Sequence, residues 1–171
     1  MRTLLSFSSL FYDQNMEFLK KYLPFLRKEK QPKKILIVDD LPVLRDTLSS
    51  ILKKDGHSVD CCGNGAEALN TLNDNDYDLM ITDIMMPECN GLDLVKAIHK
   101  DHMRNTSHMG IIAISGGENT VTPMSKLGLI KNQVDLTMQK PFSTRALLKA
   151  TEETLDKVHN GKNLTAQLAG H

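Results

Sequence analysis

The chain has 171 residues, 40% of them hydrophobic and 25% charged, which fits one globular domain of ordinary size with extensions. Residues 1–34 contain eight basic and three acidic side chains (net +5), so the other 137 carry −5. An acidic body argues against direct nucleic-acid binding by that body. No apolar stretch approaches the length of a membrane span, and the three cysteines lack metal or disulfide spacing, so we expect a cytoplasmic protein with reduced thiols.

Residues 1–33 form a compositionally distinct extension. Six of the eight aromatic residues lie within the first 25 positions, and apolar residues between Met16 and Leu26 recur at helical spacing. This pattern predicts a helical extension in which Pro24 forms a kink or begins a second helix. Three interpretations stay open: docking on the body or on a second copy as a homodimer, binding to a partner or membrane surface, or translation that starts at Met16.

From residue 34 onward the hydrophobic period alternates between that of a strand and that of a helix. We expect strands at 34–38, 57–62, 78–82, 110–114 and 134–138, each followed by a helix, at 42–54, 66–74, 91–100, 121–130 and 143–158. Five successive strand–helix units predict an α/β fold, with a parallel sheet covered on both faces. Residues 159–171 are polar and contain glycine, so we expect a loose tail there.

Polar groups stand at the carboxyl ends of four of these strands. They are Asp39 and Asp40 after the first strand, Asp83 after the third, Ser115 after the fourth and Lys140 after the fifth. In an open parallel sheet these ends converge on one crevice, where such folds bind ligands. Three carboxylates, a hydroxyl and an ammonium in one place predict a site for a divalent cation and a phosphoryl group.

The chemistry of this site follows from its oxygen ligands. Mg²⁺ prefers one or two carboxylates plus water and phosphate oxygens, so Asp40 and Asp83 are candidate ligands, with the backbone carbonyl of Met85 as a third. Asp39 would hold a metal-bound water. One carboxylate could then attack phosphorus and form an aspartyl-phosphate. In a simpler alternative, Asp39 and Asp40 only cap the helix that begins near residue 42.

Four motifs in this order resemble the receiver domain of two-component response regulators over roughly residues 34–158. They are Ile37-Val38-Asp39-Asp40, the segment from Asp83 to Gly91, Ile114-Ser115-Gly116-Gly117 and Lys140-Pro141-Phe142. The resemblance implies a flavodoxin-like (βα)₅ three-layer sandwich with a five-stranded parallel sheet.

The resemblance also implies a role for each site residue. Asp83 would be the phosphoacceptor, Asp39 and Asp40 the acid pair, Met85 the carbonyl ligand of Mg²⁺, Ser115 and Lys140 the phosphoryl-binding switch pair, and Lys140–Pro141 a cis peptide bond. The phosphoryl donor would be a sensor histidine kinase or a histidine phosphotransfer protein, and a downstream protein target would read the phosphorylated state.

One position departs from the family pattern in a way that affects signalling. The family usually has an aromatic residue three positions before the lysine, and here that position holds Thr137. A threonine cannot undergo the aromatic ring rotation, so any switch would depend on loop and helix shifts. This departure keeps open a second reading, a pseudo-receiver that binds partners independently of phosphorylation.

We expect a single-domain signalling phosphoacceptor and not an enzyme acting on a separate substrate. No stretch after residue 158 is long enough for an output domain. A phosphatase of the haloacid-dehalogenase type also uses an aspartate nucleophile with Mg²⁺. It needs a second aspartate two residues later, where this chain has Met85.

Overall fold

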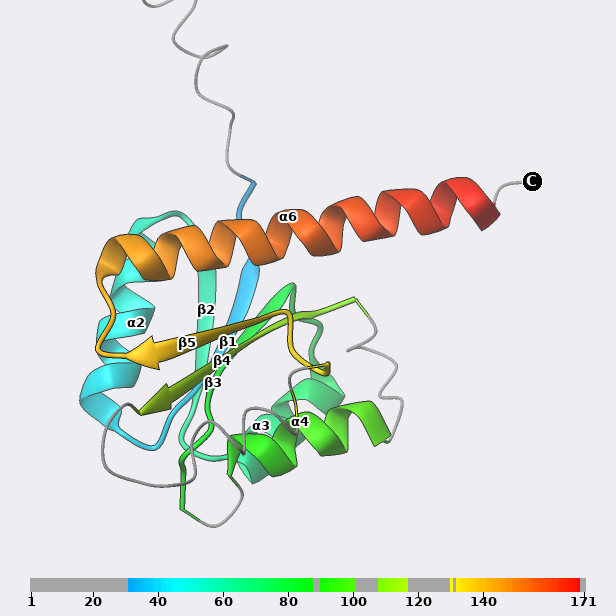
Figure 1. Cartoon of the computed structure of the whole chain (residues 1–171). Coiled ribbons are helices and arrows are strands. Elements are labelled where there is room, and N and C mark those ends of the chain that lie inside the picture. Colours follow the sequence, from blue (N-terminus) through cyan, green and yellow to red (C-terminus); the bar gives the residue numbers. More distant parts are fainter. Residues whose placement is uncertain (1–30, 88–89, 101–107, 117–129, 131, 170–171) are drawn as a thin grey trace, which may run out of the picture. The chain divides into compact units, whose positions relative to one another are not determined.

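The computed structural model describes residues 31–87, 90–100, 108–116, 130 and 132–169, with the backbone alone for 161–169 (Figure 1). The predicted helical extension before residue 31 and the predicted helix over 121–129 lie outside these ranges.

The core is a five-stranded parallel sheet with strand order β2-β1-β3-β4-β5. Its strands are β1 (Lys34–Val38), β2 (Ser58–Cys62), β3 (Leu79–Asp83), β4 (Gly110–Gly116) and β5 (Leu136–Lys140). β1, β3 and most of β4 are continuous buried runs, as expected for parallel strands covered on both faces. The predicted parallel sheet of a flavodoxin-like fold is therefore confirmed, and all carboxyl ends of its strands lie at one edge.

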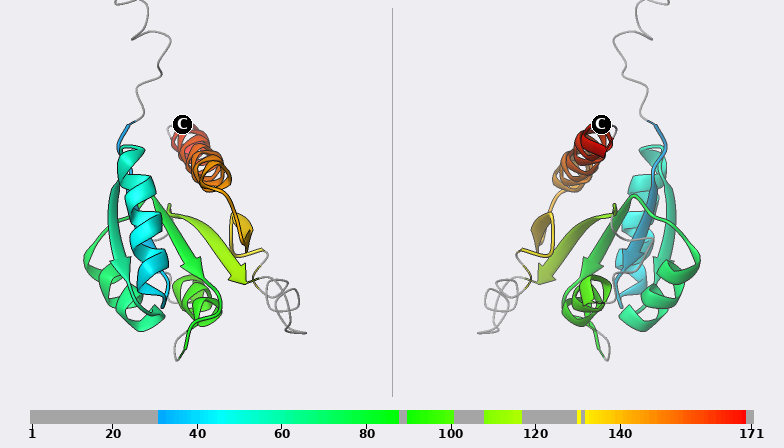
Figure 2. Two further views of the ribbon diagram at one scale, coloured as in Figure 1. Left: turned by 90° about the vertical axis from the view of Figure 1, so that its left-hand side faces the viewer. Right: turned by 90° about the vertical axis from the view of Figure 1, so that its right-hand side faces the viewer.

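Helices cover both faces of this sheet. They are α2 (Pro42–Lys54), α3 (Gly65–Asp74), α4 (Gly91–Lys100) and α6 (Thr144–Ala169). Because side chains alternate along a strand, Ile35 and Ile37 pack with α2 and α6, whereas Leu36 and Val38 pack with α3 and α4. Figure 2 shows the resulting three layers edge-on. Burial of each large aliphatic side chain stabilises the fold by roughly 1.5–3 kcal/mol.

Local sequence determines where the second and third helices begin and end. Pro42 occupies the start of α2, Lys53 and Lys54 lie in its last turn, and Gly56 follows with a φ of 97°. At the start of α3 the side chain of Asn64 accepts a hydrogen bond from the Glu67 amide at 2.8 Å. These signals are short-range, and the predicted boundaries agree with the structure within one residue.

Two predictions about the C-terminal third were wrong. β5 begins two residues later than expected, because its register with β4 pairs Ile112 with Leu136 and leaves Val134 packed beside the sheet. α6 continues to Ala169, so residues 159–169 are helical and not a loose tail. A helix already nucleated by packing extends at little cost, and the single Gly161 opposes it by only about 1 kcal/mol.

None of the helices in the described ranges combines the length and the apolar character needed to cross a membrane.

Candidate functional site

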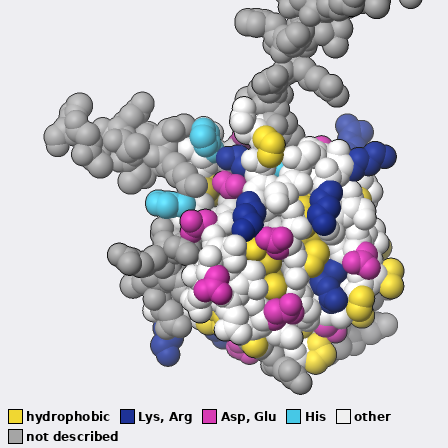
Figure 3. Space-filling view, turned by 180° about the vertical axis from the view of Figure 1, so that it is seen from behind, with side chains coloured by type: hydrophobic (Ala, Val, Ile, Leu, Met, Phe, Trp, Pro, Cys, Tyr) yellow, Lys and Arg dark blue, Asp and Glu magenta, His cyan; other side chains and the backbone are white. Residues whose placement is uncertain are grey.

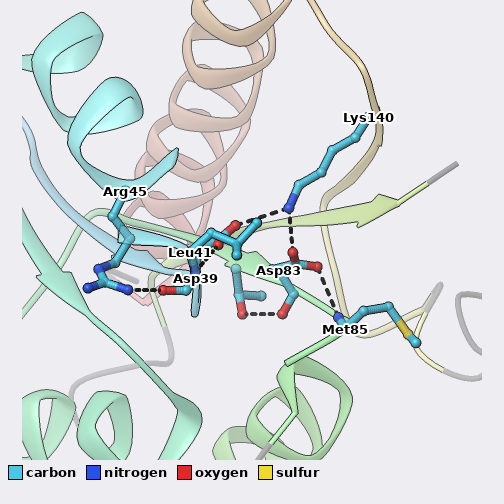
Figure 4. Close-up of polar contacts among 7 residues, drawn as sticks. Asp39, Leu41, Arg45, Asp83, Met85 and Lys140 are labelled. Atoms are coloured by element: carbon cyan, nitrogen blue, oxygen red, sulfur yellow. Dashed lines mark hydrogen bonds and ion pairs between the residues drawn. The ribbon is translucent and has the colours of Figure 1, made fainter. Parts of the chain in front are cut away.

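The carboxyl ends of β1, β3 and β5 bring three predicted site residues together (Figure 4). The Lys140 ammonium donates a hydrogen bond to Asp39 Oδ2 at 3.1 Å and another to Asp83 Oδ2. The two carboxylates are only 1% and 5% exposed. Lys140 lies 101 residues from Asp39 and 57 from Asp83 along the chain, so only the fold creates this cluster.

The cluster keeps Lys140 charged. Burial alone would lower the pKa of its ammonium, but the hydrogen bonds and charges of Asp83 and Asp39 outweigh burial and raise that pKa above its usual value. Two carboxylates removed from water are costly unless a counter-charge accompanies them. The positive charge of Lys140 therefore stabilises the two buried acids in the absence of any bound cation.

The backbone around Asp83 is tightly packed. Asp83 Oδ1 accepts a hydrogen bond from the Met85 amide at 2.9 Å, and the Asp83 carbonyl accepts one from Thr82 Oγ1 at 3.0 Å. The first residue of α4, Gly91, also lies against this backbone, and a Cβ on Gly91 would be 2.0 Å from the Asp83 carbonyl oxygen. Only glycine leaves room for this approach, so Gly91 allows Asp83 its observed position.

Asp39 is held by both its side chain and its main chain. Its Oδ1 accepts a hydrogen bond from the Leu41 amide at 2.9 Å, its N–H donates to the Cys62 carbonyl at 3.2 Å, and its carbonyl accepts from Arg45 Nη1 at 2.6 Å. The N-cap residue of α2 is Leu41, and no side chain caps it. The alternative that the acid pair only caps this helix is therefore wrong.

The donor set fits a hard divalent cation. One carboxylate oxygen from each of Asp39, Asp40 and Asp83 can be chosen so that all three lie within 4.8 Å of one another. Opposite oxygen ligands around Mg²⁺ or Ca²⁺ lie roughly 4 to 5 Å apart, twice the usual metal–oxygen distance. Asp40 also lines a hollow of about 340 Å³ with Met85, whose carbonyl stays a predicted ligand.

The remaining predicted residues lie on the last two strands. Ser115 is 3% exposed and stands one residue beyond Ile114, the residue paired with Asp83 in the β3–β4 register, so it lies at the same edge of the sheet. Thr137 is exposed on β5. The Lys140–Pro141 peptide bond is cis, as predicted. The phosphoryl-binding role of Ser115 stays a prediction.

Sequence reasoning missed two residues that shape the site. The sequence indicates only that Arg45 lies in the predicted helix at 42–54 and that Gly91 ends the motif beginning at Asp83. Their importance comes from contacts with the main chain of Asp39 and Asp83. No local pattern reports such contacts, because they are decided by how the folded segments pack and not by residue type or spacing.

Comparisons with known proteins agree with this geometry. The family model described as "Response regulator receiver domain" matches residues 35–152. A Haemophilus influenzae protein named "Transcriptional regulatory protein CpxR homolog" is 31% identical over 130 residues, which is 76% of this chain and 53% of the relative. The chain thus spans about half the length of that relative.

Two solved structures illustrate the similarity in fold. A CheY-like receiver domain protein of Methanospirillum hungatei superposes with a TM-score of 0.68 at 26% identity, covering 77% of this chain and 99% of that one. NtrX of Brucella abortus gives a TM-score of 0.69 at 25% identity, covering 79% of this chain and 30% of that one.

Proposed function

Because this chain belongs to the response regulator receiver domain family, we propose that it accepts a phosphoryl group on Asp83 with the help of Mg²⁺. The observation that supports this most is the buried cluster in which the Lys140 ammonium contacts both Asp39 and Asp83. The proposed donor is a phosphohistidine on a sensor histidine kinase or a histidine phosphotransfer protein. The proposed output is a changed affinity for a downstream protein.

Each residue has a separate part in the proposed transfer. A carboxylate oxygen of Asp83 attacks phosphorus, the phosphorus–nitrogen bond breaks, and its electron pair stays with the donor imidazole. The Met85 amide would orient the attacking carboxylate, and Lys140, whose ammonium donates to Asp83, would bind a phosphoryl oxygen. Asp39, Asp40 and Asp83 would hold Mg²⁺, with the Met85 carbonyl as an additional ligand. When bound, Mg²⁺ offsets the negative charge of the phosphoryl oxygens.

Phosphorylation by a small acyl phosphate tests this proposal without knowledge of the cognate kinase. Wild-type protein with acyl phosphate and Mg²⁺ should gain one phosphoryl unit by intact mass, and EDTA should prevent the gain. Asp83→Asn should remain unmodified, whereas Asp46→Asn, a matched change on an exposed position of α2, should behave as wild type. A wild type that stays unmodified, or an Asp83→Asn variant that is still labelled, would refute the proposal.

The same reasoning makes the chain a signalling protein and not a phosphatase with a separate substrate. A haloacid-dehalogenase type phosphatase needs a carboxylic acid two residues after its nucleophile, and that position is an exposed methionine, Met85. Multiple turnovers of a generic phosphomonoester by the wild type would contradict this part of the proposal.

Partner binding independent of phosphorylation is the second candidate function. The observation that favours it is Thr137, exposed on the edge strand at the position where the family usually has an aromatic residue. Equal partner affinities for unmodified and Asp83-phosphorylated protein would support this alternative. A difference in affinity would support phosphorylation-dependent switching.

The proposed partners are proteins and not nucleic acids. On the face drawn in Figure 3, acidic and basic side chains of the described residues are interspersed around small hydrophobic areas. Such a mixed surface does not form the continuous basic stripe that phosphate backbones attract. The chain aligns with only 53% of the Haemophilus relative, so the similarity does not include the rest of that transcriptional regulatory protein.

A further inference from the structure

We propose that Arg45 is a positioning residue for the acid pair and that its contact with the Asp39 carbonyl sets the affinity for Mg²⁺. This inference rests on the proposed function, since it concerns the same site. Arg45 is not itself a candidate ligand, and among the described residues it forms no hydrogen bond or ion pair with Asp83.

The main chain of Asp39 is fixed from two directions. Arg45, in the first turns of α2, donates from Nη1 to the Asp39 carbonyl at 2.6 Å (Figure 4). The Asp39 N–H donates to the Cys62 carbonyl at the end of β2. The guanidinium also lies beside the turn after β2, where a Cβ on Gly63 would be 3.7 Å from Nη1. Arg45 therefore connects the acid pair to both neighbouring segments.

The bonded carbonyl belongs to the peptide group that joins the two acids. Rotation of this peptide would redirect the Cα–Cβ bond of Asp40 relative to that of Asp39. The Asp39 side chain has further anchors in the Leu41 amide and in Lys140. Within the described residues the Asp40 carboxylate has no hydrogen bond of its own, so its direction depends on the main chain that Arg45 holds.

Two effects of Arg45 on cation binding have opposite signs. Its positive charge repels Mg²⁺, so repulsion alone predicts that removing the charge tightens binding. Its hydrogen bond pre-orients the ligands, and loss of such outer contacts typically weakens metal binding by roughly 10–100-fold. The guanidinium is partly exposed and screened by solvent, so we infer that orientation outweighs repulsion.

Titration calorimetry with Mg²⁺ on metal-free protein distinguishes these effects. Arg45→Met keeps the aliphatic stem and removes the charge and the donors, and we expect Mg²⁺ to bind it about tenfold more weakly. Arg45→Lys keeps the charge and an N–H group that can donate to the Asp39 carbonyl, and we expect an affinity within about threefold of wild type. Lys53→Met removes a charge from the exposed last turn of the same helix and serves as the control.

A second readout needs no metal. In EDTA, the ¹³C shift of the Asp39 carbonyl and the ¹⁵N shift of the Asp40 amide should change in Arg45→Met and return toward wild type in Arg45→Lys. Circular dichroism at the assay temperature verifies that each variant is folded. A purely structural role would lower the melting temperature and leave the Mg²⁺ affinity of the folded protein unchanged.

The outcomes separate this inference from the proposed function. The role of Arg45 is overturned if Arg45→Met binds Mg²⁺ as tightly as wild type or more tightly. It is also overturned if Arg45→Met binds weakly and Arg45→Lys binds equally weakly. Neither result contradicts the phosphorylation of Asp83. Absence of Mg²⁺ uptake and of phosphorylation in the wild type would instead overturn the proposed function itself.

Discussion

Substitution of Gly91 by alanine is the most direct test of how α4 and Asp83 fit together. An ideal Cβ at Gly91 would lie 2.0 Å from the Asp83 carbonyl oxygen, 2.8 Å from its carbonyl carbon and 2.9 Å from Thr82 Oγ1. The two closest atoms belong to the backbone of a buried strand, so they cannot rotate away as a flexible side chain would. Relief to 3.0 Å requires the start of α4 and the end of β3 to separate by about 1 Å.

The free-energy cost of separating α4 from β3 can be estimated from core substitutions in other proteins. Overpacking a well-packed core typically destabilises a protein by about 1–3 kcal/mol. A rigid overlap of this size belongs at the upper end of that range. Alanine regains at most about 1 kcal/mol of helix propensity over glycine. We therefore expect Gly91→Ala to lower the free energy of unfolding by about 2–3 kcal/mol. Because a misplacement of about 1 Å can slow a reaction roughly 100-fold, phosphorylation of Asp83 should slow by a similar factor.

Urea unfolding followed by circular dichroism measures the first effect, and acyl phosphate labelling of the folded variant measures the second. Gly63→Ala is the matched control, because a Cβ there would lie 3.5 Å or more from its neighbours, an ordinary contact distance. The control should stay within about 0.5 kcal/mol of wild type. If Gly91→Ala lowers the free energy of unfolding by less than about 1 kcal/mol and Asp83 is labelled at the normal rate, the backbone of Asp83 does not restrict residue 91 to glycine.

Three further predictions follow from the charges and burial in the structure. Asp83 and Asp39 raise the pKa of Lys140 above the ordinary lysine value of 10.5, so its contribution to stability is complete below that pH and is lost as pH rises through the native pKa. The difference in the free energy of unfolding between wild type and Lys140→Met, measured by urea unfolding, should therefore be the same from about pH 7 to 9 and become smaller at about pH 11. A difference that is as large at about pH 11 as at about pH 7 would contradict this. Thr154 is fully buried, and within the described part of the chain its hydroxyl has no hydrogen-bond partner, so Thr154→Val should raise the free energy of unfolding by about 1 kcal/mol. A lower free energy of unfolding in this variant would indicate that the hydroxyl does have a partner. Mg²⁺ at ten times its dissociation constant should stabilise the wild type against thermal unfolding by about 1.4 kcal/mol, and it should stabilise Asp40→Asn by much less. Equal stabilisation of both proteins by Mg²⁺ would show that Asp40 is not a ligand.

The elements predicted best were those whose signals lie within a few residues. The bounds of β1 and α2 agree fully with the prediction, because an apolar run, a proline at the helix start and a glycine after its end are local features. β5 was displaced by two residues, since pairing with β4 decides its register and Val134 resembles a strand residue in sequence alone. The end of α6 was missed because helix propagation needs no further packing signal.

For the site, the sequence by itself determined which groups are available: three acids, a serine and a lysine, each placed after a strand. It also determined that these groups lie at one edge of the sheet, because parallel strands deliver their carboxyl ends to the same edge. Only the tertiary structure decided how they meet, with Lys140 shared between Asp39 and Asp83, Arg45 on the Asp39 carbonyl and Gly91 against the Asp83 backbone. The physical reason is that residue type and spacing encode local conformation, whereas hydrogen bonds across 101 residues and backbone contacts at van der Waals limits arise from packing of the whole domain.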